Sequence, residues 1–101
     1  MASGTTRVCH GAYVVDATPA LISILTIGFR PTRVKLTNQA GDEAWWQDGM
    51  ADDSMHKRTA AGVGSFVTSA AITPLANGFS IGTDADLNGV AAETVHFEVL
   101  D

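Results

Sequence analysis

The end of the chain carries the pattern that most constrains its fold. Apolar and polar residues alternate strictly over residues 94–100, so Val95, Phe97 and Val99 share one face of a β-strand. The preceding segment, residues 77–89, is dense in Asn, Asp and Gly, which supply turn conformations. A terminal strand frays unless neighbours hold it. We therefore expect this strand to lie inside a sheet, with the turn segment fixing its register.

The rest of the chain consists of short segments of the same kind. No segment longer than about ten residues shows the 3.6-residue repeat of an amphipathic helix. Turn signals separate the segments, and the expected strands are residues 7–15, 21–27, 32–38, 43–47, 60–73 and 94–100. This pattern predicts an all-β fold, an antiparallel, jelly-roll-like β-sandwich of about 6–8 short strands.

Three segments carry additional expectations. Gly11 interrupts the first strand and suggests a bulge or bend. Pro74 should end the strand over residues 60–73, because proline cannot donate to a β-ladder. Residues 50–59 are polar and could hold a helical turn, although they lack the repeat of a buried helix.

The length of 101 residues predicts a single domain. We expect residues 1–6 to form a flexible N-terminal arm and residues 7–101 to form the β-sandwich domain. Only 17 % of the residues are charged, against about a quarter in typical soluble domains. The low charge suggests that part of the surface faces protein rather than water.

Composition argues against several classes of partner. The net charge is −5 and the basic residues form no stripe, so nucleic acid is not an expected partner. The single cysteine, Cys9, excludes an intrachain disulfide, and no zinc-ligand set or cofactor motif is present. The most apolar run, residues 21–29, is too short to span a bilayer, so no membrane association is expected.

No set of residues predicts catalysis. Cys9 and His10 are adjacent in an expected strand and therefore point to opposite faces. Asp52, Asp53 and His56 could approach one another, but their surroundings favour a solvated polar loop. We expect no enzyme activity.

Residues 84–89 reproduce the opening of a calcium-binding loop, with oxygen ligands at alternate positions. The bidentate acid required at the twelfth position falls on Val95, which cannot ligate. Asp84, Asp86 and Asn88 are therefore expected to satisfy backbone donors in turns, and no metal site is predicted.

Two segments together resemble a known group of modules. Residues 28–34 form a GF-x-P-x-x-V corner, and residues 78–88 form a GF-x-I-G-x-D-x-x-L-N loop that leads to the final strand. In this order they resemble the small β-sandwich modules of tailed-bacteriophage virion proteins, over roughly residues 17–100. Such modules occur as tail-fibre or head-fibre domains and as capsid auxiliary proteins.

The resemblance implies a function, a location and partners. The chain comprises the module alone, which favours a capsid decoration (cement) protein that binds the shell exterior. It would be made in the host cytoplasm, reside on the virion and assemble with its own copies, as a trimer, and with the major capsid protein or another virion protein. The alternative is a receptor- or glycan-binding head domain of a tail or head fibre.

The adjacent Trp45 and Trp46 provide the main interaction hypothesis. In a strand they project to opposite faces, and Trp46 shares its face with Ala44. We expect Trp46 to point inward and Trp45 to lie at a subunit or capsid contact, where aromatic anchors are favoured. Alternatively, loops of the same chain cover both rings, or an exposed tryptophan stacks on a sugar.

Further contact residues are expected on three segments. They are the basic residues His56, Lys57 and Arg58, the corner residues Arg30 and Arg33, and the branched residues Ile22 and Ile24. The basic residues would orient the protein on an acidic shell, or they form only a solubilising loop tip. The segment of Ile22 and Ile24 has branched residues on both faces, so it is either sandwiched within the molecule or covered by another subunit.

Overall fold

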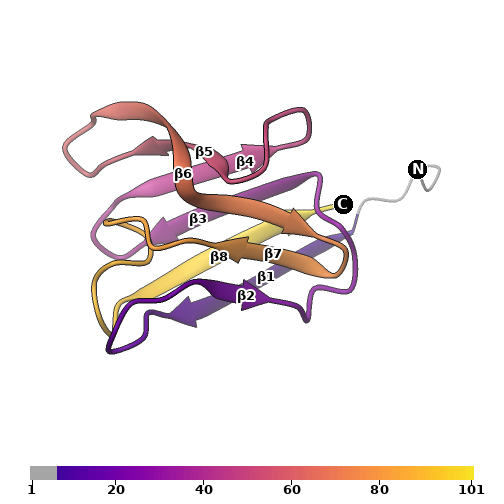
Figure 1. Ribbon diagram of the computed structural model, residues 1–101, viewed down its shortest axis with the longest axis horizontal. Helices are drawn as coiled ribbons and strands as arrows, with labels where there is room; N and C mark the ends of the chain where they lie inside the picture. Colours follow the sequence, from indigo (N-terminus) through magenta and orange to yellow (C-terminus); the bar gives the residue numbers. More distant parts are fainter. Residues whose placement is uncertain (1–6) are drawn as a thin grey trace.

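Eight β-strands make up the computed structural model, which describes residues 7–101 (Figure 1). The strands are β1 (Val8–Val14), β2 (Ile22–Ile24), β3 (Arg33–Asn38), β4 (Glu43–Gln47), β5 (Ser54–Arg58), β6 (Gly64–Leu75), β7 (Gly78–Ile81) and β8 (Thr94–Leu100). All neighbouring strands are antiparallel, in the order β1-β8-β3-β4-β5-β6-β7-β2. The all-β class is therefore confirmed. The expected arm, residues 1–6, lies outside the described residues.

The eight strands form one continuous sheet that curls over on itself. Strand β6 bends at Ala70, whose φ is +52°, and its register against β5 shifts between Ser54 and Met55. Its first half pairs with β5, and its second half crosses in front of β3 and β8 to pair with β7 (Figure 1). The rings of Phe79 in β7 and Phe97 in β8 touch edge to face at 5.4 Å. The strands thus form a single curled sheet, and the predicted sandwich arrangement is not confirmed.

The space inside the curl holds the hydrophobic core. The fully buried core side chains include Val34, Leu36, Trp46, Met55, Ile72, Phe79, Ile81, Leu87, Val95 and Val99. Strand β8 lies between β1 and β3, and its alternate residues are buried. The predicted position and inward face of the last strand are therefore confirmed.

Strand β5 is missing from the sequence prediction, which places a polar segment or a helical turn there. In β5 the inward-facing side chains of the alternating pattern are Met55 and Lys57, and Lys57 is charged. Because an inward lysine breaks the apolar alternation, the period of two is hidden in the sequence.

Pro74 lies within β6 and does not end it, contrary to the prediction. It is paired with Phe79, one position before the pair Leu75 and Gly78 that closes the hairpin. In such a hairpin Pro74 falls at a non-hydrogen-bonded pair, so its nitrogen faces away from β7. The pairing with β5 ends at Ile72, so no ladder bond is lost there.

Two glycines are needed for close packing. Gly11 shows no bulge, because β1 runs in unbroken register with β8, and a Cβ there would lie 2.5 Å from Cζ of Phe97. Gly78 lacks the positive φ that its Asn-Gly sequence suggests. Instead, a Cβ at Gly78 would lie 1.8 Å from the carbonyl oxygen of Ile24. Both glycines let neighbouring groups approach more closely than alanine allows.

The close approach at Gly78 predicts that Gly78→Ala lowers the free energy of unfolding by about 3 kcal/mol, because the backbone of β2 must move away from β7. Gly64→Ala is the matched control: it lies in β6 with ordinary φ, and the nearest atom to its added Cβ is 4.0 Å away. Urea unfolding followed by tryptophan fluorescence measures both. A loss below about 0.5 kcal/mol in Gly78→Ala would contradict the described packing.

Candidate interaction surface

A row of side chains crosses the outer face of six neighbouring strands. The cross-strand register aligns one residue from each strand, all on the face that points away from the core. From β1 to β6 the row consists of His10, Glu98, Lys35, Trp45, His56 and Phe66. We call this set the outer row. Its members come from positions spread over the whole chain, and only the folded sheet brings them together.

One end of the outer row is aromatic. The rings of Trp45 and His56 stack with centroids 5.3 Å apart and an interplanar angle of 16°. Phe66 meets His56 edge to face at 5.1 Å and remains 51 % exposed. Such pairs hold the rings in fixed orientations. These three residues, the aromatic cluster, therefore form a continuous, partly apolar patch on the surface.

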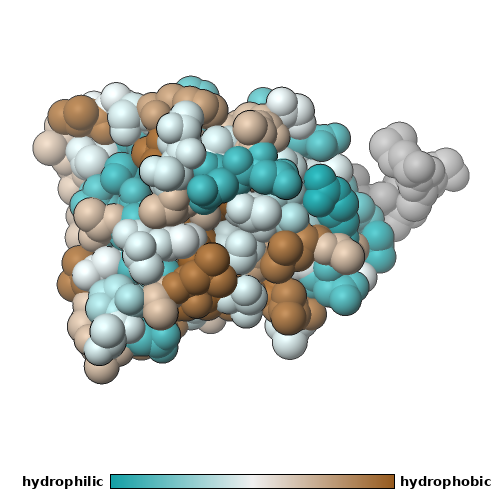
Figure 2. All heavy atoms as spheres, in the orientation of Figure 1, coloured by the Kyte–Doolittle hydropathy of each residue, from teal (hydrophilic) through white to brown (hydrophobic). Residues whose placement is uncertain are grey.

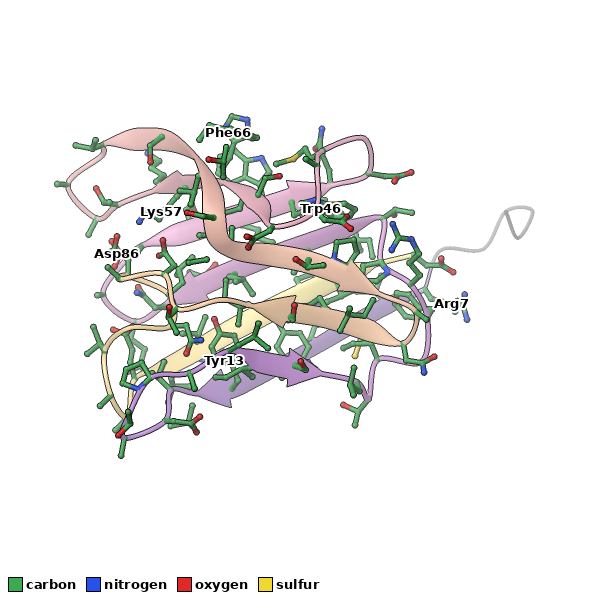
Figure 3. The ribbon with its side chains drawn as sticks, viewed as in Figure 1. Arg7, Tyr13, Trp46, Lys57, Phe66 and Asp86 are labelled. Atoms are coloured by element: carbon green, nitrogen blue, oxygen red, sulfur yellow. The ribbon has the colours of Figure 1, made fainter. Side chains whose placement is uncertain are left out.

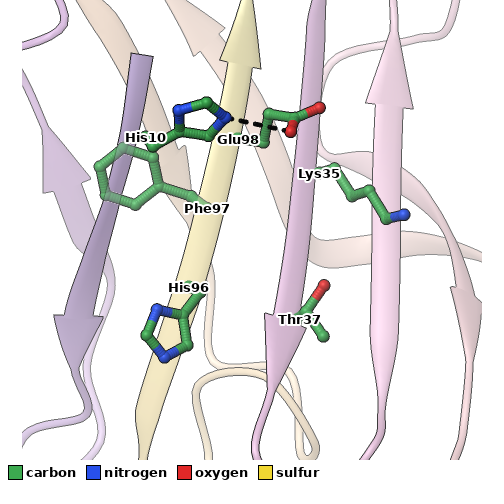
Figure 4. A pocket seen from close by; sticks show the side chains of 6 residues that line it. All are labelled: His10, Lys35, Thr37, His96, Phe97 and Glu98. Atoms are coloured by element: carbon green, nitrogen blue, oxygen red, sulfur yellow. Dashed lines mark hydrogen bonds and ion pairs between the residues drawn. The ribbon is translucent and has the colours of Figure 1, made fainter.

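The other end of the outer row is polar and slightly hollowed. A shallow depression of about 240 Å³ is lined by His10, Lys35, Thr37, His96, Phe97 and Glu98 (Figure 4). His10 Nε2 and Glu98 Oε2 lie 3.1 Å apart, and both side chains are largely exposed. An exposed pair of this kind contributes little to stability. The depression therefore offers polar and charged groups for contact with a partner.

Four of the predicted contact residues share this outer face. Trp45 and His56 belong to the outer row, Arg33 lies opposite Gln47, and Arg58 lies opposite Glu43. Both arginines are exposed. The aromatic cluster is thus flanked by cationic side chains. Arg30 lies apart from it, at the corner before β3, where its Nη1 donates to the carbonyl of Pro74 at 3.5 Å.

Trp46 points into the core, as predicted, and is not available to a partner. It is 1 % exposed, and its Nε1 donates to the carbonyl oxygen of Ala51 at 3.0 Å. The inclusion of Trp46 among the contact residues is therefore wrong. The alternation of the strand separates it from Trp45, which is half-buried on the outer face.

Lys57 also differs from the expectation, because it forms an internal ion pair and does not belong to an exposed basic spot. Its Nζ lies 3.0 Å from Asp84 Oδ1 and 2.9 Å from Asp86 Oδ2, and its side chain is 13 % exposed. Figure 3 shows Lys57 and Asp86 side by side. Burial lowers the pKa of Lys57, but hydrogen bonds and attraction from Asp86 and Asp84 outweigh it and raise the pKa above 10.5.

The loop after β7 is organised by hydrogen bonds within the chain. Asp84 Oδ2 accepts from the backbone N–H groups of Asp86 and Leu87 at 3.1 and 3.2 Å. Asn88 Nδ2 donates to three backbone carbonyls, those of Ala20, Ile81 and Gly82. Backbone satisfaction by Asp84 is confirmed, whereas Asn88 acts as a donor. Among residues 7–101, no group of three or more His, Cys, Asp or Glu is placed to hold a metal ion.

Tyr13 links this loop to the edge of the sheet. Its hydroxyl donates to the carbonyl oxygen of Leu87 at 2.8 Å. Burial raises the pKa of Tyr13, and the negative charges of Asp84 and Glu93 raise it further. The hydroxyl therefore stays neutral and keeps its role as a donor.

Four of the residues considered for catalysis have separate places in the structure. Cys9 faces inward on β1 and His10 faces outward. Asp53 Oδ1 accepts from the backbone N–H of Ala71 at 2.8 Å, so Asp53 supports the bend of β6. His56 stands in the middle of β5 as part of the aromatic cluster, and the predicted polar loop is therefore wrong for His56.

Ile22 and Ile24 are half-buried and pack against the core of their own chain. The exposed apolar side chains of this segment are their neighbours Leu21 and Leu25, at 61 % and 58 %. Figure 2 shows apolar side chains gathered over β2.

Phe66 and Lys35, both in the outer row, are absent from the predicted contact residues because only the cross-strand register brings them beside Trp45 and His56.

Comparison of the chain with protein-family models, with curated proteins and with solved structures found no match. The described residues contain no helix long and apolar enough to cross a membrane. The assignment of function therefore rests on the surface described above and on the sequence resemblance.

The ion pairs of Lys57 predict that Lys57→Met lowers the free energy of unfolding by about 2 kcal/mol, because Asp84 is left buried without its cation. The raised pKa of Lys57 means that its stabilisation is complete below pH 10.5 and is lost as the pH rises through the higher folded value. The difference between wild type and variant should therefore shrink in alkaline solution.

Lys35→Met is the matched control, since Lys35 lies on the outer row and its change should cost less than about 0.5 kcal/mol. Urea unfolding at neutral pH and above pH 10.5 measures both variants. Equal stability of Lys57→Met and wild type at neutral pH would contradict a stabilising ion pair.

Proposed function

We propose that this chain is a structural protein of a tailed-bacteriophage virion, a capsid decoration protein that binds the shell exterior and stabilises it as a homo-oligomer. The phage context comes from the resemblance of residues 28–34 and 78–88 to virion modules. The observation that carries the binding role is the outer row, in which an aromatic cluster lies beside charges of both signs.

The outer row has the chemistry of a protein contact. Aromatic side chains supply large contact areas at low entropic cost, and they dominate binding energy at many interfaces. Lys35, Arg33 and Arg58 add positive charge around the aromatic cluster, although the whole protein is acidic. Such charges fix orientation and association rate more than affinity. Repetition of many copies over a symmetric shell would then multiply weak individual contacts.

The stack of Trp45 and His56 favours a protein partner over a sugar. A sugar ring binds to an open aromatic face, whereas His56 lies nearly parallel over one face of Trp45 at 5.3 Å. Phe66, at the end of the aromatic cluster, is 51 % exposed. A receptor- or glycan-binding fibre head remains the second candidate, supported by that exposed ring. A glycan array separates the two, because sugar binding without shell binding would support the second.

The proposal predicts that the purified protein cosediments with shells of the phage that carries its gene, prepared without this protein. Trp45→Ala should weaken that binding about 10- to 30-fold, because it removes the centre of the aromatic cluster. Leu21→Ser is the control, since Leu21 is apolar and 61 % exposed but lies beside β2, which contributes no residue to the outer row.

Circular dichroism and thermal unfolding confirm that both variants fold. Failure of the wild-type protein to bind shells contradicts the decoration proposal. If Leu21→Ser weakens shell binding more than Trp45→Ala does, the contact lies on the surface beside β2 and the outer row is not the binding surface.

A further inference from the structure

Strand β1 is a long edge strand whose outer side has no partner among residues 7–101. It spans seven residues and pairs with β8 in unbroken register, without a bulge. Proteins usually protect sheet edges with short strands, prolines, bulges or lysines. The opposite edge strand, β2, is short, with three residues. Strand β1 has none of these protections and thus resembles a strand that pairs with another chain.

The hydrogen bonds at the two ends of β1 show which backbone groups face outward. The N–H of Val15 donates to Glu93, and the carbonyl of Arg7 accepts from Asp101, both at 2.9 Å. In an antiparallel ladder the bonded positions alternate, so the odd-numbered residues of β1 bond towards β8. The even-numbered residues, from Val8 to Val14, direct their N–H and C=O groups to the open edge.

The side chains along this edge are symmetric about Gly11. The outward-facing residues are Val8, His10, Ala12 and Val14, with the two valines at the ends. Val8 is 52 % exposed and Val14 is 57 % exposed, so both leave apolar surface in water. Such an edge can pair antiparallel with a second copy of itself about a two-fold axis, with valine opposite valine at both ends.

We propose that β1 pairs antiparallel with β1 of a second copy of this chain, about a two-fold axis at Gly11. Val8 then lies opposite the second copy's Val14, and His10 opposite its Ala12, each as a hydrogen-bonded pair. A shift by two residues towards either end leaves Val8 or Val14 unpaired. The Gly11-centred register therefore satisfies the most edge groups and buries valine against valine.

This inference deepens the proposed function, and it rests on the homo-oligomer part of it alone. A two-fold contact uses the same surface on both copies and closes after two, so it gives a dimer in place of the trimer that the resemblance implies. The two sheets join at their edges, and the outer faces of both copies become one continuous surface. Each dimer then presents two outer rows to a partner.

The first test is the mass in solution, measured by light scattering over a concentration series. We expect twice the chain mass of 10.5 kDa. Ala12→Pro removes an outward N–H without removing a bond to β8, so it should give a folded monomer. Ala12→Val keeps that N–H and should remain dimeric. Circular dichroism checks the folding of both variants.

The second test addresses the register through two double variants at the same positions. Val8→Lys with Val14→Lys places like charges opposite each other across the axis, and it should abolish the dimer at low salt. Val8→Lys with Val14→Glu places opposite charges there, and it should keep the dimer. The difference in dimer stability between these two double variants should shrink at high salt, because salt screens the charges.

A wild-type monomer at all concentrations overturns the inference, and so does a wild-type trimer. If the Lys/Lys and the Lys/Glu double variants form equally stable dimers, the proposed register is overturned. These measurements use the protein without shells, whereas the proposed function is tested by cosedimentation, so the failure of one is distinguishable from the failure of the other.

Discussion

The ion pairs between Lys57 and the carboxylates of Asp84 and Asp86 connect the middle of the sheet to the loop before β8. The arrangement of the other strands depends on this connection. Lys57 lies in β5, in the middle of the sheet, and the two acids lie in the loop that leads from β7 to β8. The same Asp84 carboxylate accepts two backbone N–H groups, and Tyr13 fixes the next turn of the loop. The direction in which the chain enters β8 is thereby determined, and β8 in turn aligns β1 and β3.

The sequence pattern predicts the parts of this fold that depend on local chemistry. The alternation of β3, β4 and β8, the inward Trp46 and the turn at residues 38–42 all follow from neighbouring residues. The errors arise where a distant partner changes the meaning of a residue. From the sequence alone Lys57 is predicted to be a surface charge, because its partners Asp84 and Asp86 are distant in the chain. The proline within β6 is predicted to end the strand, but the pairing of β6 with β5 stops before Pro74, so the proline interrupts no hydrogen bond there.

The candidate surface was predictable only in part for the same reason. The outward orientation of Trp45 follows from its strand, and its contact role is a proposal based on its chemistry. Its stacking partner His56 lies on a strand hidden from the sequence, and Phe66 comes from a segment of weak alternation. Lateral order in a sheet is decided by pairing between distant segments, which composition and periodicity do not encode.

The pairing of β1 with β8 has a consequence for the order of folding. Arg7 and Asp101, which form an ion pair beside these strands, are 94 positions apart in the chain. Strand β1 has no other partner strand among residues 7–101, so it can join the sheet only after β8 has been synthesised. Until then, β1 has no strand partner within residues 7–101. The pairing of β1 with β8 spans almost the whole described chain, and such non-local pairing slows folding.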